Sequence, residues 1–190
     1  MRERVVVDTS KWEPWQRGYR FGVIVVMPPQ DIASSIDALR QAYDQKSHAI
    51  CSAHISVSDP LCRELSGDAK EEIRELLRAV APFEVHYDQP AASTRRPGVV
   101  YPVTPQEKFD EIKRVIHQAS VFDDTAYSRR EIPAHMTIAE FVTIEDSLRI
   151  CADLADTAPR GSFWCDRLEY IVPDATFRFH RCEVFLLGHR

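Results

Sequence analysis

The sequence predicts an α+β fold that forms one compact unit with a repeated order of elements. Some segments carry apolar residues at helical spacing, whereas others are short runs rich in β-branched and aromatic residues. The order strand, helix, strand, helix occurs twice along the 190 residues, although the two halves share little sequence identity. No linker rich in glycine or serine separates the halves, so a common core is expected.

The first half of the chain contains two predicted strands and two predicted helices. Residues 19–27 are rich in β-formers and end at two prolines, which indicates a strand. Residues 31–43 and 67–80 each carry an apolar stripe at helical spacing and predict helices. Residues 50–57, between these helices, predict the second strand.

The second half repeats this order after one additional strand, residues 83–87. Strands are predicted over residues 83–87 and 98–103, a helix over residues 108–118, and another strand over residues 134–142. The intervening residues 121–133 are polar and irregular.

The last part of the chain begins with a helix start signal. Thr143 and Asp146 form a capping box, with Asp146 in place of the usual Glu, so a helix is predicted from there to about residue 155. Residues 161–172 and 177–187 predict two closing strands.

Composition excludes several classes of protein. The net charge of −5 argues against a long basic face that tracks a nucleic-acid backbone, but it permits a small basic cleft. The five cysteines are odd in number and include no C-x-x-C pair, which argues against a disulfide framework or a zinc knuckle. No apolar run approaches the roughly 20 residues that span a bilayer, and the first residues carry no signal-peptide segment. We therefore expect a cytoplasmic protein.

The residues that suggest chemistry lie in two matched segments on predicted strands. The segments are AHISV, residues 53–57, and AHMTI, residues 134–138. Alternate residues of a strand face the same side, so His54 shares a face with Ser56, and His135 shares a face with Thr137. If the two halves are related by pseudo-symmetry, these polar faces can line opposite sides of a common cleft.

Two histidines with adjacent hydroxyls suit phosphodiester chemistry. An in-line displacement at phosphorus needs a base on the attacking oxygen and an acid on the leaving oxygen. Histidine has an ordinary pKa of about 6.5, so one imidazole can be neutral and the other protonated near neutral pH. The two hydroxyls can donate hydrogen bonds to the non-bridging phosphate oxygens, and no metal is required.

The two segments resemble the twin H-x-[ST]-x motif of the two-histidine (2H) phosphoesterases, which include 2′-5′ RNA ligase (LigT-like) proteins and cyclic phosphodiesterases. The resemblance spans residues 19–187 and implies one domain over residues 1–190, with residues 1–18 as an N-terminal extension. It implies two pseudo-symmetric lobes, each an antiparallel sheet with outer helices, which enclose a central cleft.

This resemblance also implies a function. His54 and His135 match the catalytic histidines, and Ser56 and Thr137 match the hydroxyls that hold the phosphate. The implied activity is metal-independent hydrolysis of a 2′,3′-cyclic phosphate on a small nucleotide or an RNA end, without a cofactor. Two alternatives remain: 2′-5′ ligation of tRNA-like RNA, and a non-catalytic nucleotide-binding module. We expect a monomer with no membrane partner.

The chain departs from the family pattern after the second motif. LigT-like proteins often carry an arginine there, whereas this chain has Ala-Glu-Phe over residues 139–141. A carboxylate beside a phosphate would repel it, so Glu140 is expected to point away, and this departure argues more against ligation than against cleavage. Arg129, Arg130 and Arg95 are candidates for the missing basic group.

Aromatic side chains provide candidates for contact with a base. Tyr101, Tyr127 and Phe141 could each stack on a nucleobase, with packing in the core as the alternative for each. We include Tyr101 among the expected substrate-binding residues.

Overall fold

A computed structural model of the chain describes residues 7–93, 96–122 and 131–188. The first half contains η1 (Gln16–Tyr19), β1 (Val23–Val26), α1 (Gln30–Tyr43), α2 (Gln45–Ile50), β2 (Ile55–Ser56), α3 (Gly67–Leu77), β3 (Phe83–Tyr87) and β4 (Ala91–Ala92). The second half contains β5 (Val99–Thr104), α4 (Gln106–Ile116), η2 (Ser120–Phe122), β6 (His135–Ala139), α5 (Ile144–Leu154), β7 (Gly161–Cys165), β8 (Arg167–Pro173) and β9 (Phe179–Leu186).

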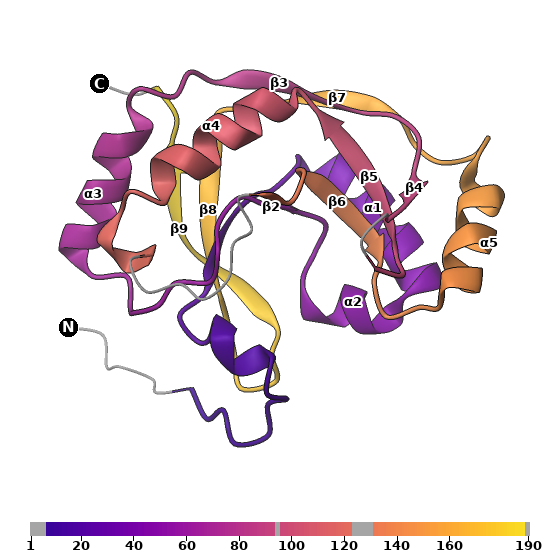
Figure 1. Ribbon diagram of the computed structural model, residues 1–190, viewed down its shortest axis with the longest axis horizontal. Coiled ribbons are helices and arrows are strands. Elements are labelled where there is room, and N and C mark those ends of the chain that lie inside the picture. Colours follow the sequence, from indigo (N-terminus) through magenta and orange to yellow (C-terminus); the bar gives the residue numbers. More distant parts are fainter. Residues whose placement is uncertain (1–6, 94–95, 123–130, 189–190) are drawn as a thin grey trace.

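The strands form one curled antiparallel sheet, and helices pack outside it (Figure 1). The strand order is β7-β3-β5-β6-β2-β1-β8-β9, with β4 beside β5. β2 and β6 are the middle pair, and three strands follow on either side of them. One half of the nine-stranded sheet therefore contains β2, β1, β8 and β9, and the other contains β6, β5, β3 and β7 together with β4, which confirms the α+β fold with an antiparallel sheet in each lobe.

The repeated order of elements is confirmed in the structure. β1 pairs with β2 in one half, and β5 pairs with β6 in the other. The helix that follows the first strand begins directly after a proline in both halves, at Pro29 for α1 and at Pro105 for α4. Each half thus carries its motif on the strand that lies at the boundary between the two.

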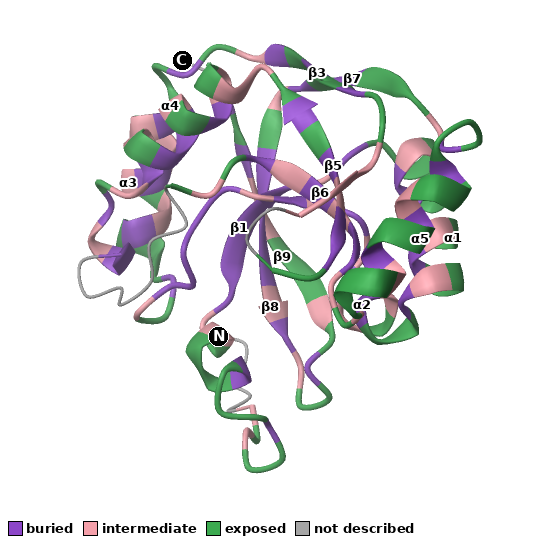
Figure 2. Cartoon of the chain, turned by 45° about the vertical axis from the view of Figure 1, so that its right-hand side comes forward, coloured by how far each residue is buried: buried purple, intermediate pink, exposed green. Residues whose placement is uncertain are grey.

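Both halves contribute to one continuous apolar core. It includes Ile24 and Ile55 from the first half and Val103 and Ile138 from the second, all of them fully buried. β1 is buried along its whole length (Figure 2). Among the described residues, no helix is long and apolar enough to span a bilayer.

Three predicted elements need correction. The first strand begins later than predicted, because the chain turns at Gly22, whose φ is 80°. A Cβ there would lie 2.2 Å from the carbonyl oxygen of Ile171, so only glycine permits this turn. Residues 45–50 form helix α2, capped by Asp44, where a strand was predicted from residue 50. Residues 161–172 form two strands, β7 and β8, which belong to opposite halves of the sheet.

The capping box at α5 is confirmed, and it supports a prediction about stability. The Thr143 hydroxyl accepts a hydrogen bond from the backbone N–H of Asp146 at 3.0 Å. Replacing Thr143 by alanine is expected to lower the free energy of unfolding by about 1 kcal/mol, because that N–H loses its partner. Urea unfolding measures this, with Thr157→Ala as the control, since the Thr157 hydroxyl donates to a carbonyl oxygen four residues earlier and caps no helix start. An equal loss in both variants would contradict the capping role.

Candidate active site

The two motif segments lie side by side at the middle of the sheet, in β2 and β6 (Figure 1). Ile55 lies opposite Met136 in the antiparallel ladder, and both side chains are fully buried. Burial alternates along residues 53–57 and 134–138: the alanine and both apolar positions are buried, and the two positions between them are partly exposed. The same face of both strands therefore points into the core, and the opposite face carries the histidines and hydroxyls.

The register places the four polar side chains next to one another. One residue beyond the Ile55–Met136 pair on either side, His54 lies opposite Thr137, and Ser56 lies opposite His135. Directly opposed Cβ atoms are about 4.5–5.5 Å apart and diagonal neighbours about 7–8 Å apart. The two imidazoles thus lie diagonally across the strand pair, each with a hydroxyl directly opposite it.

Both imidazoles are oriented by the same contact. Nδ1 of His54 lies 2.7 Å from the carbonyl oxygen of Ser52, and Nδ1 of His135 lies 2.7 Å from that of Pro133. A carbonyl oxygen only accepts, so Nδ1 carries the proton in each ring. In the neutral tautomer Nε2 is then the nitrogen that carries no proton.

A carboxylate on α1 holds the segment that leads into the first motif. Asp37 accepts a hydrogen bond from the backbone N–H of Ala53 at 2.8 Å, and its other oxygen accepts one from the Ser52 hydroxyl. Ser52 also supplies the carbonyl that orients His54. Asp37 therefore fixes the backbone on which the first imidazole is mounted.

Arg40, one turn further along α1, connects the segment that precedes the first motif to β6. Its guanidinium donates to the carbonyl oxygens of Ser47 at 2.9 Å and Cys51 at 2.8 Å, and also to that of Thr137 in β6. The side chain is only 2% exposed. Burial lowers the pKa of Arg40 below its usual value, yet a guanidinium starts so high that it stays charged.

The second half uses α4 in the same way. Gln106 donates to the carbonyl oxygen of Ala134 and accepts from its N–H, both at 2.8 Å. Lys113, 2% exposed, donates to the carbonyl oxygen of Ile132 at 2.7 Å. Both histidines are therefore preceded by backbone that side chains of an outer helix hold in place, which is the kind of support that precise catalytic geometry requires.

These supporting residues were missed from the sequence, although a signal exists. Arg40 lies four residues after the buried Ile36, and Lys113 lies four residues after the buried Phe109. A charged residue within the apolar stripe of a helix must be buried with partners, and polar backbone near a motif is a natural partner.

The flanks of the polar face are apolar. Val25 of β1 lies opposite Ser56, and on the other side Pro102 of β5 lies opposite His135.

Glu140, which was expected to point away from a phosphate, has its carboxylate paired with Arg96 at 3.1 Å. Its charge is therefore offset by a guanidinium.

Tyr101 is a core residue, which corrects the expectation that it stacks on a base. It lies opposite Met136, on the apolar face of the β5–β6 pair, and it is fully buried with its ring packed edge-on against Tyr87. Burial raises the pKa of the Tyr101 hydroxyl. Phe141 is 40% exposed and packs against the ammonium group of Lys46.

The predicted basic residues Arg95, Arg129 and Arg130, together with Tyr127, lie outside the described residues.

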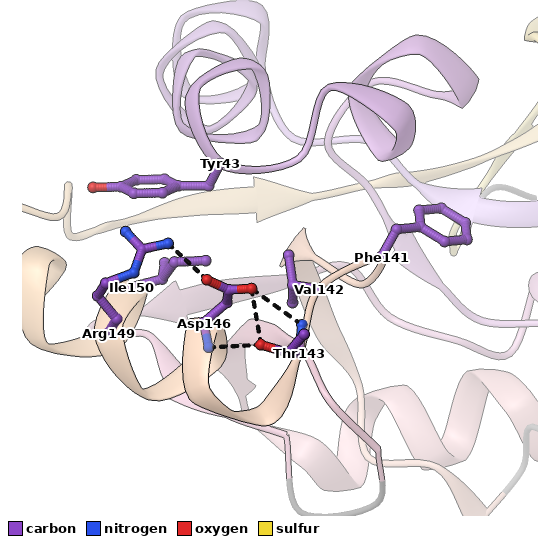
Figure 3. A pocket seen from close by; sticks show the side chains of 7 residues that line it. All are labelled: Tyr43, Phe141, Val142, Thr143, Asp146, Arg149 and Ile150. Atoms are coloured by element: carbon purple, nitrogen blue, oxygen red, sulfur yellow. Dashed lines mark hydrogen bonds and ion pairs between the residues drawn. The ribbon is translucent and has the colours of Figure 1, made fainter.

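A hollow of about 530 Å³ lies between the end of α1 and the start of α5 (Figure 3). It is lined by Tyr43, Phe141, Val142, Thr143, Asp146, Arg149 and Ile150, so neither motif contributes to it. The Asp146 carboxylate is already bonded to Thr143 and Arg149. The polar groups of this hollow cap α5, and we do not assign the chemistry to it.

Comparisons with known proteins found one matching family and several solved structures with a similar fold. The sequence model described as the 2′-5′ RNA ligase superfamily matches residues 28–176. A crystal structure of a phosphoesterase is similar with a TM-score of 0.58 at 15% identity, over 90% of this chain and 99% of that one. E. coli LigT complexed with 3′-AMP is similar with a TM-score of 0.58 at 12% identity, again over 90% and 99%. The protein TT0787 of Thermus thermophilus has a TM-score of 0.51 at 10% identity, over 88% and 98%. No curated protein sequence matches the chain. At these identities the structures establish the shared fold.

Proposed function

Since the chain belongs to the 2′-5′ RNA ligase superfamily, we propose that it is a metal-independent phosphodiesterase that hydrolyses a 2′,3′-cyclic phosphate on a nucleotide or an RNA end. The observation that carries the proposal is the diagonal placement of His54 and His135 on one sheet face, each opposite a hydroxyl. E. coli LigT, a structural neighbour, has been crystallised with 3′-AMP and with phosphate. Ligands of this kind fit a site built around one phosphate group.

The proposed reaction opens the cyclic phosphate with water. A neutral imidazole removes a proton from the water through Nε2 while the water oxygen attacks phosphorus. The other imidazole, protonated, gives its Nε2 proton to the 2′ or 3′ oxygen as the bond from that oxygen to phosphorus breaks. The product is a phosphomonoester with one free hydroxyl. His54 and His135 supply these two roles, which exchange when the reaction runs in reverse.

Ser56 and Thr137 support the phosphate in this mechanism. Their hydroxyls share the face of the imidazoles and can donate to the non-bridging oxygens as negative charge develops on them. Because such donors act most strongly in the transition state, their loss lowers kcat more than it raises KM.

The basic test is hydrolysis of 2′,3′-cyclic nucleotides, and of an RNA oligonucleotide with a cyclic phosphate end, by the purified protein in EDTA. Turnover of either substrate is expected. Absence of turnover of both, with and without added divalent metal, would reject the proposed activity.

Removing one hydroxyl is expected to have a clear effect. Ser56→Ala and Thr137→Val should each lower kcat by about 10²-fold, because one preorganised donor to the phosphate is lost. Steady-state kinetics on a cyclic nucleotide measures this. Ser162→Ala is the matched control, since Ser162 is an exposed hydroxyl on the edge strand β7 that bonds Glu84. If the control lost as much activity as the two variants, the proposed phosphate contact would be wrong.

A second activity, 2′-5′ ligation of RNA ends, is suggested by the description of the family. The pairing of Glu140 with Arg96 weakens the charge argument against ligation that the sequence alone raised. An RNA with a 2′,3′-cyclic phosphate end, incubated with a second RNA that carries a 5′-hydroxyl, tests this activity. A joined product sensitive to His54→Ala would add ligation to hydrolysis, and no joined product at any salt concentration would restrict the protein to hydrolysis.

A further inference from the structure

A second pocket, outside both motifs, is lined by three arginines. It has a volume of about 460 Å³, and its lining residues are Arg17, Gly18, Arg20, Phe21, Leu61, Cys62 and Arg63. None of these seven residues is acidic, and all three arginines are exposed. In a chain with a net charge of −5, the exposed guanidinium groups of Arg17 and Arg20 place positive charge beside this hollow.

The backbone holds the two sides of this pocket together. The N–H of Gly22 donates to the carbonyl oxygen of Tyr19 at 2.7 Å, which closes the turn after η1. The N–H of Leu61 then donates to the carbonyl oxygen of Gly22 at 3.0 Å, which ties the loop after β2 to that turn. The arginines therefore come from two segments with a fixed relation to each other.

The N-terminal segment itself is anchored to the body of the protein. Trp12 is 4% exposed, and its indole N–H donates to the carbonyl oxygen of Ala175 at 3.1 Å. Trp12 and Trp15 both pack edge-on against Phe177 in the β8–β9 turn. Arg17 and Arg20 thus stand on a segment that is packed onto the sheet.

Two of the arginines keep their charge available. Within the part of the chain that the structure describes, no carboxylate forms an ion pair with Arg17 or Arg20, and the Arg20 guanidinium lies over the Phe21 ring, 4.5 Å from its centroid. Ion pairs are formed by Arg40, Arg74, Arg78, Arg96, Arg149, Arg160, Arg167 and Arg181. An arginine pocket without acidic lining residues is suited to an anion such as phosphate, which guanidinium groups bind through paired hydrogen bonds.

The pocket lies at one end of β2, which carries the first motif, and of its neighbour β1. Leu61 follows Ser56 of β2 by five residues, and Gly22 precedes Val25 of β1, the residue opposite Ser56, by three. Three residues of strand span about 10 Å. This is the backbone distance from Gly22, next to the lining residue Phe21, to the residue opposite Ser56, and an extended RNA strand covers such a distance within a few nucleotides.

We infer that the pocket of Arg17, Arg20 and Arg63 binds a phosphate of single-stranded RNA on the 5′ side of the reacting cyclic end. The inference rests on the proposed function and narrows its substrate class to RNA ends. Arg17 and Arg20 precede residues 28–176, so two of the three guanidinium groups come from outside the region that the family model matches.

The test measures binding separately from turnover. Fluorescence anisotropy gives the Kd of a single-stranded RNA tetranucleotide with a 2′-phosphate end, and competition gives that of a nucleoside 2′-monophosphate. Arg17→Ala and Arg20→Ala should each raise the Kd of the RNA about tenfold. Each should also make the fall of the log association constant with log salt concentration less steep by about 0.7, the value for one lost phosphate contact. The Kd of the mononucleotide should stay the same. Arg114→Ala is the control, since Arg114 is an exposed arginine on α4 that lines neither pocket.

The outcomes separate the two proposals. An equal loss of affinity for RNA and mononucleotide, or the same loss with Arg114→Ala, would overturn the inference. An RNA affinity that depends on Arg17 and Arg20, in a protein that hydrolyses no cyclic end, would leave the pocket in place and reject the proposed activity. Hydrolysis of cyclic ends with no effect of either variant on RNA binding would leave the activity in place and reject the pocket.

Discussion

Replacing His54 or His135 by alanine is expected to lower kcat for cyclic-phosphate hydrolysis by about 10²–10⁴-fold in each case. Each imidazole supplies one of the two proton transfers, and neither hydroxyl beside it can replace an acid or a base near neutral pH. The free energy of unfolding should change little, because both side chains are partly exposed on the polar face of the sheet.

A double variant tests whether the two histidines act in the same step. Because the two histidines act in one step, His54→Ala/His135→Ala should be hardly slower than either single variant, as expected for residues that act as a unit. His86→Ala is the matched control, since His86 is exposed on β3 and carries no motif. Full activity in either single variant would exclude the two-histidine mechanism.

Replacing Arg40 by methionine is expected to lower the free energy of unfolding by about 3–5 kcal/mol. Methionine keeps much of the aliphatic volume, so the loss comes from polar groups: the carbonyl oxygens of Ser47, Cys51 and Thr137 lose their donor. Asp37 also loses its ion-pair partner at 3.2 Å. Each polar group left unsatisfied away from water is costly.

Urea unfolding monitored by circular dichroism measures this loss. Arg149→Met is the control, because the Arg149 side chain is 60% exposed and its ion pairs are on the surface of α5, so no measurable change is expected. A stability of Arg40→Met within about 1 kcal/mol of the wild type would show that the three carbonyl oxygens find other donors, and that Arg40 does not hold the segment before the first motif to β6.

Local patterns accounted for much of the fold. The apolar stripes of α1, α3 and α4 and the capping box of α5 depend on neighbouring residues, so these elements could be predicted from the sequence. Alternation along residues 53–57 and 134–138 likewise predicted which side chains share a face, and the burial pattern confirms it. Helix α2 was missed because it has only six residues and depends on Asp44, whose carboxylate also accepts N–H groups from the loop after β6.

The rest depends on contacts between residues far apart in the chain. The sequence did not show that β2 pairs directly with β6, since nothing local encodes a pairing across about 80 residues. The placement of Tyr101 followed from that pairing: β5 lies beside β6, and its register turns Tyr101 toward Met136 and the core. The burial of Arg40 and Lys113 depends on the carbonyl oxygens that surround them, which only the folded chain brings together.

The Ile55–Met136 pair has a consequence for how errors in folding can occur. Side chains alternate along a strand, so a slip of β2 against β6 by one residue would rotate an entire motif to the opposite face. Such a slip would expose Ile55 to water and place an imidazole in the apolar core, which removes packing and catalysis together. A stable molecule with misaligned histidines is therefore disfavoured, and any selection that maintains the packed core of this protein also maintains the alignment of its reactive groups.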